Sequence, residues 1–123
     1  MLEEQSKTVQ EFFSNQFNQG LEDEEGLNFL ADIGETIEPN FLSEAASEAY
    51  TFYQQNVEDA DWGNVQLYQA RIENINVYII YVSTDGDDGW LEIYNDQDQG
   101  LGFAQYDFET LNWSDQETIR AEV

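Results

Sequence analysis

Val77–Val82 has the sequence VYIIYV, six consecutive apolar or aromatic residues of the types that favour β-strands. Side chains alternate along a strand, so the odd-numbered residues face one side of a sheet and the even-numbered residues face the other. Neither set is polar. We therefore predict a central strand that is covered on both faces, with the rest of the chain supplying its pairing partners and its cover.

The segments that follow and precede this stretch predict an antiparallel meander of strands joined by short turns. Gly, Asn and Asp gather between the apolar segments, where turns need residues that tolerate positive φ. The expected strands are 65–72, 77–82, 90–94 and 101–108, with turns at 73–76, 85–89 and 95–100. Leu111–Trp113 is the candidate for a fifth strand, so we expect four to five strands.

Apolar residues at helical spacing dominate the first part of the chain. Helices are expected over 2–19, within 22–33 and over 41–57, and the connection at 34–40 contains the single proline. The segment 114–120 has two interpretations, a helical turn with a capping box of Ser114 and Glu117 or an extended strand. Helices followed by strands indicate the α+β class, with the helices packed on one face of the sheet.

The chain is expected to form one domain over 1–123, mainly helical over 1–60 and mainly antiparallel strands over 64–113. Its charge is unusual, because 27 Asp and Glu stand against three Lys and Arg for a net charge of −24. A small domain needs a net charge of only about 2–8 for solubility. The excess costs stability through self-repulsion, and it is explained by imitation of a polyanion, by adaptation to high salt, or by a merely acidic surface.

Several function classes are excluded by residues that the chain lacks. Without Cys or His it has no thiolate metal site, no disulfide and no His-based catalytic triad. Three cations cannot neutralise a nucleic-acid backbone, so direct binding to nucleic acid is not expected. Asp85–Gly89 only superficially resembles a calcium loop, since Trp90 falls where the required glycine should stand. We expect no enzyme activity, no metal and no cofactor.

No signal peptide is recognisable at the N-terminus, and no apolar run reaches the about 20 residues that span a bilayer. We therefore expect a cytoplasmic protein that does not bind a membrane. The acids are spread through segments that should fold, with spacings of roughly 6 Å for helical i, i+4 pairs and roughly 6.6 Å for strand i, i+2 pairs. Acidic turns at both ends of the strand Trp90–Tyr94 predict a negative ridge along that strand's edge, through Glu92.

The acidic clusters are the candidate partner-binding residues. They are Glu22, Asp23, Glu24, Glu25, Glu44, Glu48, Glu58, Asp59, Asp61, Asp85, Asp87, Asp88, Glu92, Asp96 and Asp98. In size, charge and dispersal of acids over folded elements, the chain resembles the acidic DNA-mimic proteins, such as the neisserial mimic that engages the histone-like HU protein. Because these proteins share no motif, the resemblance assigns no residue.

The resemblance implies a protein without a cofactor that competes with DNA for a basic DNA-binding protein, such as an HU-like nucleoid protein, a repressor or a nuclease. It is compatible with a monomer or a small homo-oligomer. The alternative is an acidic interaction module whose specificity comes from exposed aromatic residues. The candidates for that role are Trp62, Trp90, Tyr94 and Trp113, although tryptophans are more often core residues.

Overall fold

The computed structural model describes residues 2–17, 34–36, 44–61, 63–84, 88–107, 110–121 and 123. Along the chain the elements are α1 (Leu2–Phe17), β1 (Gly34–Thr36), α3 (Glu44–Tyr53), the π-helix η2 (Gln54–Glu58), β2 (Gly63–Ile72), β3 (Ile75–Thr84), β4 (Asp88–Asn95), β5 (Gly100–Asp107), β6 (Thr110–Ser114) and α4 (Gln116–Arg120). Among the helices in these ranges, none is both long enough and apolar enough to cross a membrane.

The strands form one antiparallel sheet in the order β1-β2-β3-β4-β5-β6, so every strand pairs with its neighbour in the sequence. The predicted α+β class and meander are confirmed, and the candidate strand at Leu111–Trp113 is β6. The short strand β1 adds a sixth member, in a segment for which the sequence predicted a connection. The stretch Val77–Val82 lies in β3, between β2 and β4, as predicted for a central strand.

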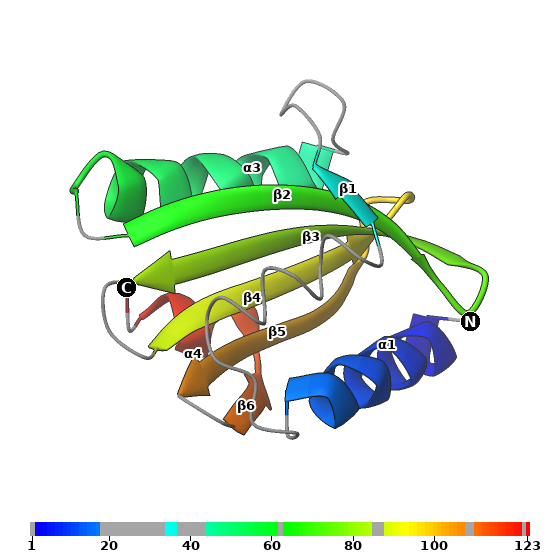
Figure 1. The fold of residues 1–123 in the computed structure, drawn as a ribbon. Coiled ribbons are helices and arrows are strands. Elements are labelled where there is room, and N and C mark those ends of the chain that lie inside the picture. The colour runs from blue at the N-terminus through cyan, green and yellow to red at the C-terminus, as the bar shows by residue number, and fades with distance from the viewer. Residues whose placement is uncertain are drawn as a thin grey trace.

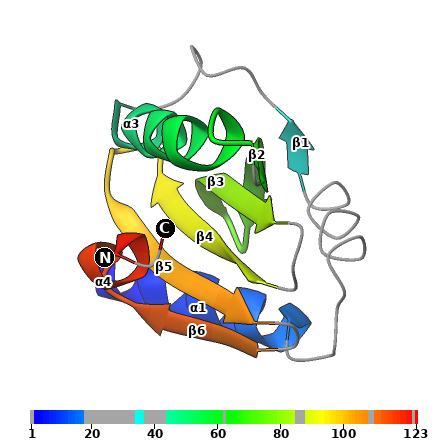
Figure 2. The same ribbon diagram turned by 90° about the vertical axis from the view of Figure 1, so that its left-hand side faces the viewer.

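The prediction that the helices pack on one face of the sheet is wrong, because they cover both faces (Figures 1 and 2). Val9 and Phe13 of α1 pack in one core with Ile79 of β3. Helix α3, η2 and Ile119 of α4 pack in a second core with Ile80. The reason is the apolar character of β3 on both sides, since an uncovered face would leave a row of large apolar side chains in water.

Local chemistry explains how several elements begin and end. Glu73 and Asn74 both have positive φ, 49° and 71°, which is typical of a two-residue type I′ turn between β2 and β3. Helix α4 settles the segment after β6 as a helical turn, and its N-cap is Asp115 instead of Ser114. The Thr118 N–H donates to the Asp115 carboxylate at 2.7 Å and thereby lowers the pKa of Asp115. The helix expected within 22–33 lies outside the described residues.

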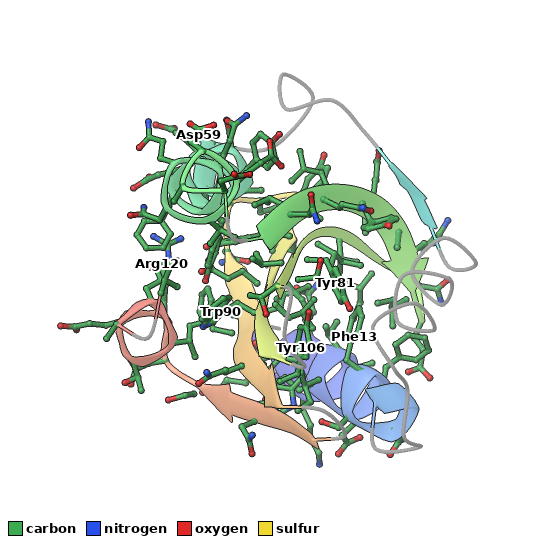
Figure 3. The ribbon with its side chains drawn as sticks, turned by 60° about the vertical axis from the view of Figure 1, so that its left-hand side comes forward. Phe13, Asp59, Tyr81, Trp90, Tyr106 and Arg120 are labelled. Atoms are coloured by element: carbon green, nitrogen blue, oxygen red, sulfur yellow. The ribbon has the colours of Figure 1, made fainter. Side chains whose placement is uncertain are left out.

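Tyr106 fixes three neighbouring strands on the α1 side of the sheet (Figure 3). Its hydroxyl donates to the Val82 carbonyl at 2.7 Å, and its ring stacks on Tyr81 with the ring centroids 5.6 Å apart. To reach β3 from β5, the side chain passes over Gly89 of β4. A Cβ atom on Gly89 would lie 2.1 Å from both the Val82 carbonyl oxygen and the Tyr106 hydroxyl, so only glycine fits there.

We predict that Gly89→Ala lowers the free energy of unfolding by about 2–4 kcal/mol, because it displaces the Tyr106 ring and breaks its hydrogen bond. Urea unfolding measures this loss. The matched control is Gly100→Ala, whose Cβ would meet only the end of the half-buried Phe103 ring, at 2.5 Å, and should cost clearly less. Equal losses in the two variants would contradict the role given to Gly89.

Candidate functional site

Glu92 lies in the middle of β4, between Ile80 of β3 and Phe103 of β5. Its side chain has no exposed surface. The predicted ridge of negative charge through Glu92 is therefore wrong, since β4 is an interior strand whose faces are both covered. Glu92 is a buried charge on the α3 side of the sheet, and its hydrogen-bond partners decide what surrounds it.

Four residues donate hydrogen bonds to the Glu92 carboxylate. Oε2 accepts from the Tyr53 hydroxyl at 2.5 Å and from Arg120 Nε at 2.8 Å. Oε1 accepts from the Tyr94 hydroxyl at 2.7 Å, from Arg120 Nη2 at 2.9 Å and from Gln116 Nε2 at 3.2 Å. The carboxylate is thus fully satisfied, and Arg120 binds it through two parallel bonds, the strongest geometry available to this pair.

Arg120 extends from α4 toward α3 on the Trp90 side of the sheet (Figure 3). Its guanidinium carbon lies 4.6 Å from the centre of the Phe52 ring and 5.8 Å from that of Tyr53, and only 19% of its side chain is exposed. Burial alone would lower the pKa of Arg120, but the hydrogen bonds and charge of Glu92 outweigh it and raise the pKa. The guanidinium is therefore held charged against the Glu92 carboxylate, 2.8 Å away.

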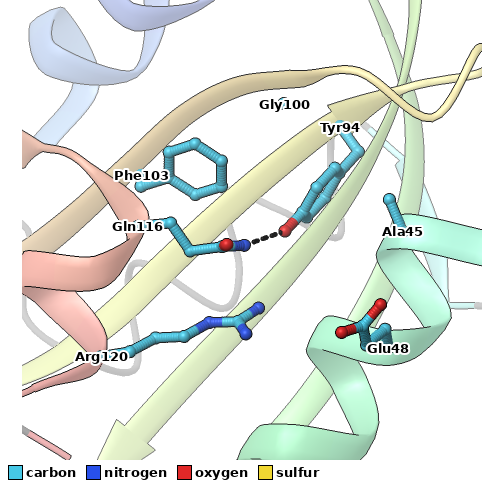
Figure 4. A pocket seen from close by; sticks show the side chains of 7 residues that line it. All are labelled: Ala45, Glu48, Tyr94, Gly100, Phe103, Gln116 and Arg120. Carbon is cyan, nitrogen blue, oxygen red and sulfur yellow. Dashed lines mark hydrogen bonds between the residues drawn. The ribbon is translucent and has the colours of Figure 1, made fainter.

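A cleft of about 270 Å³ opens above this ion pair, between α3, α4 and the strands β4 and β5 (Figure 4). It is lined by Ala45, Glu48, Tyr94, Gly100, Phe103, Gln116 and Arg120. The Gln116 Nε2 donates to the Tyr94 hydroxyl at 2.7 Å across its floor. Glu48 is exposed, so the cleft has a carboxylate on its α3 side and polar groups at its base.

Several predicted site residues come together beside this cleft. Glu44 and Glu48 are exposed on successive turns of α3. The Ala45 N–H donates to Asp98 Oδ1 at 3.1 Å, which attaches the turn between β4 and β5 to the first turn of α3. Asp96 is exposed in the same turn. The structure thereby brings together acids that are about fifty residues apart in the sequence, at a helix N-terminus where negative charge is favourable.

A second group of predicted residues lies at the other end of the helical segment formed by α3 and η2. Glu58 is half-buried and accepts the Val65 N–H at 3.3 Å, whereas Asp59 and Asp61 are exposed. Burial, followed by the charges of Glu58 and Asp59, raises the pKa of the Tyr50 hydroxyl. The negative charge of these acids therefore acts on a side chain about two helical turns away.

The remaining predicted acids are not brought into the site by the described part of the structure. Glu22–Glu25, Asp85 and Asp87 lie outside the described residues. Asp88 begins β4, and its side chain is not among those described. In the ranges that are described, no three acidic residues are arranged to hold a metal ion.

The alternative based on exposed aromatic residues is wrong for two of its candidates. Trp90 and Tyr94 are only 2% and 3% exposed, and both pack in the core on the α3 side. Trp113 is half-buried and donates its Nε1 hydrogen to Ser14 Oγ at 2.6 Å, which ties β6 to α1. Trp62 lies outside the described residues. The tryptophans that can be placed are structural.

The three Lys and Arg residues lie in different parts of the molecule. Lys7 is exposed on α1, four residues from both Glu3 and Glu11, where it offsets their charge. Arg71 is exposed at the hairpin end of β2, next to Asn74. Arg120 is the sole Lys or Arg within the described helices α3, η2 and α4, and its charge is neutralised by Glu92.

Sequence reasoning missed Arg120, Gln116 and Tyr53 as the groups that build this site. A signal for Glu92 was present, since it shares one face of its strand with Trp90 and Tyr94 and should therefore be buried. Its partner could not be identified from the sequence alone. No protein-family model matches the chain, and no curated protein or solved structure shows significant similarity to it.

We predict that Arg120→Ala lowers the free energy of unfolding by about 3–5 kcal/mol, because it leaves the buried Glu92 carboxylate without its counter-charge. Chemical denaturation measures the loss. Arg71→Ala removes an exposed arginine and should change the free energy by less than about 0.5 kcal/mol.

Adding Glu92→Gln to the Arg120→Ala variant should recover stability, because it removes the unpaired charge and leaves the amide to bond with the neighbouring hydroxyls. We expect a coupling free energy of about 1–3 kcal/mol between the two positions in a double-mutant cycle. Additive losses would contradict a charge pair at this site.

The buried tyrosines predict a loss of stability at high pH. Burial, followed by the charge of Glu92, raises the pKa of Tyr53 and Tyr94 above 10.0. The stability that these protonated hydroxyls contribute is complete below pH 10.0 and is lost as the pH rises toward the folded-state pKa. The reason is that only the unfolded chain then releases these protons. Above pH 10 the dependence of the unfolding free energy on pH should have a slope that is smaller in Tyr94→Phe, by an amount that approaches about 1.4 kcal/mol per pH unit one unit higher, where the unfolded tyrosine is mostly ionised. An unchanged slope would sink this account.

Proposed function

We propose that this protein is a DNA mimic, which occupies the cationic nucleic-acid-binding surface of another protein and competes there with DNA. The contact surface in this proposal is the acidic face, defined here as Glu44, Glu48, Glu58, Asp59, Asp61, Asp96 and Asp98. One observation carries the proposal. The described helices α3 and η2 of the acidic face and the neighbouring α4 carry no free Lys or Arg, because Arg120 of α4 is already paired with Glu92.

The spacing of the acids supports this choice. Glu44 and Glu48 are separated by about 6 Å along the axis of α3, close to two phosphate steps of about 3.4 Å on one DNA strand. Glu44 and Asp59, at the two ends of the helical segment, are roughly 20 Å apart, the axial length of about six base pairs. A rigid helix therefore presents carboxylates over a length that suits a short DNA-binding site.

The strength of the electrical field also favours a cationic partner. A net charge of −24 attracts a basic protein over distances up to the Debye length of about 8–10 Å and raises its association rate. The partner in this proposal is a basic DNA-binding protein such as a nucleoid protein, a repressor or a nuclease. The proposal places the protein in the cytoplasm, where such partners act, and requires neither a cofactor nor an enzymatic reaction.

The test is a charge reversal on two faces of the molecule. The triple variant Glu44→Lys, Glu48→Lys, Asp59→Lys changes the acidic face, and the control Glu3→Lys, Glu4→Lys, Glu11→Lys makes the same change in charge on α1. Each immobilised protein captures partners from a lysate, and duplex DNA is then used to displace them. We expect the first variant to lose at least about tenfold in affinity and the control to stay within about threefold, since screening limits distant charges.

A captured protein supports the proposal only if duplex DNA releases it and it binds DNA by itself. Equal weakening by the two triple variants would show that diffuse charge, and not the acidic face, drives binding. Capture that survives molar salt would contradict an electrostatic interface and with it the mimicry.

A further inference from the structure

We infer that the cleft beside the acidic face receives one arginine side chain of the partner. This inference rests on the proposed function and adds the chemistry of the partner's contact residue. The cleft volume of about 270 Å³ lies just below the range of about 300–1,000 Å³ that is typical of small-molecule sites. It therefore suits a single long side chain that projects from a protein surface.

The charges of the cleft select a cation. Arg120 is positively charged, but Glu92 binds it at 2.8 and 2.9 Å and cancels that charge. Glu48 remains as the uncompensated charge of the lining, so the site as a whole is negative. Asp98 lies beside it, through its contact with Ala45. The negative charge of the cleft and the net charge of −24 repel an anion and attract a cation.

The polar groups of the cleft are held in a fixed orientation. The Gln116 amide donates through Nε2 to both Tyr94 and Glu92, at 2.7 and 3.2 Å. With its donors directed there, the amide oxygen is the group of Gln116 left to accept a hydrogen bond from a ligand. Together with the Glu48 carboxylate it offers two acceptors to one occupant, which matches the several N–H donors of a guanidinium group.

The aromatic wall of the cleft favours arginine over lysine. The Phe103 ring packs edge-to-face against Tyr94, with ring centroids 5.8 Å apart, and sits over Gly100. Phe103 is only half-buried, so it can present ring surface to an occupant. A planar guanidinium stacks on such a ring and bonds a carboxylate through two parallel hydrogen bonds, which a compact ammonium group cannot do.

The probe for this inference is the peptide acetyl-Gly-Arg-Gly-amide, titrated into isotope-labelled protein and followed by NMR. We expect saturable shifts of the Gln116 side-chain amide and of the Gly100 and Ala45 backbone amides. The corresponding lysine peptide should bind more weakly, and the peptide with uncharged citrulline should produce no saturable shifts. Inorganic phosphate is the anionic comparison and should leave these signals unchanged.

Two matched substitutions on α3 distinguish binding in the cleft from attraction by the overall negative charge. Glu48→Gln should weaken the binding of the arginine peptide by about three- to fivefold, as expected for the loss of a partly exposed ion pair. Glu44→Gln removes the same charge one turn earlier, outside the cleft lining. It should weaken the binding of the arginine peptide by less than about twofold. Phe103→Leu keeps the apolar volume but removes the ring, and it should reduce the preference for arginine over lysine.

Three results would overturn the inference. They are equal weakening by Glu48→Gln and Glu44→Gln, equal binding of the arginine and citrulline peptides, and shifts of the cleft signals by phosphate but not by the arginine peptide. Because the peptide titration uses no partner protein, it can succeed even if no DNA-displaceable partner is captured. Capture that remains intact while the peptide fails to bind would instead reject the cleft and leave the mimicry standing.

Discussion

The ion pair between Glu92 and Arg120 is the constraint on which the α3 side of the molecule depends. A carboxylate without exposed surface must be paired and hydrogen-bonded, because the cost of burying an isolated charge exceeds the stability of a whole domain. Its partners come from β4, α3 and α4, so the same contacts hold two helices against the sheet. The pair therefore holds α3 and α4 to the sheet. It also affects the charge of the surface.

That consequence is a separation of roles between the two sides of the sheet. On the α1 side, aromatic packing and the contact of Tyr106 with Val82 hold the strands together, and Lys7 offsets neighbouring acids. On the α3 side, the cation needed by the core is withdrawn from the surface. The described helices α3, η2 and α4 thus carry no unpaired Lys or Arg, because Arg120, the one cation among them, is bonded to Glu92.

The sequence was sufficient for the meander because strand pairing here is local. The hydrophobic pattern of Val77–Val82 and the turn residues around it specify each hairpin without long-range information. The same apolar pattern predicted that both faces of this strand are covered. The prediction that the helices pack on one face was inconsistent with it and proved wrong. The capping residue of α4 was misplaced by one position, because Ser114 and Asp115 can both accept from a helical N–H.

The site was harder to predict because it is made by contacts distant in the sequence. The spacing of the acids along 41–59 placed Glu44, Glu48, Glu58 and Asp59 on the outer face of a helix, and all but the half-buried Glu58 are exposed. The contact of Asp98 with Ala45 depends on how a hairpin turn meets a helix, and no local pattern records that geometry. Glu92 and Arg120 are similar, because only the packed structure brings them together.

The order of these partners along the chain has a consequence for biosynthesis. Glu92 leaves the ribosome 28 residues before Arg120, so the hairpins β2 to β4 can pair while the carboxylate still lacks its counter-charge. Until α4 emerges, closing α3 over the sheet would bury that charge alone. The nascent chain should therefore keep its second core open and hydrated until α4 has left the ribosome, and close it once Arg120 can pair with Glu92.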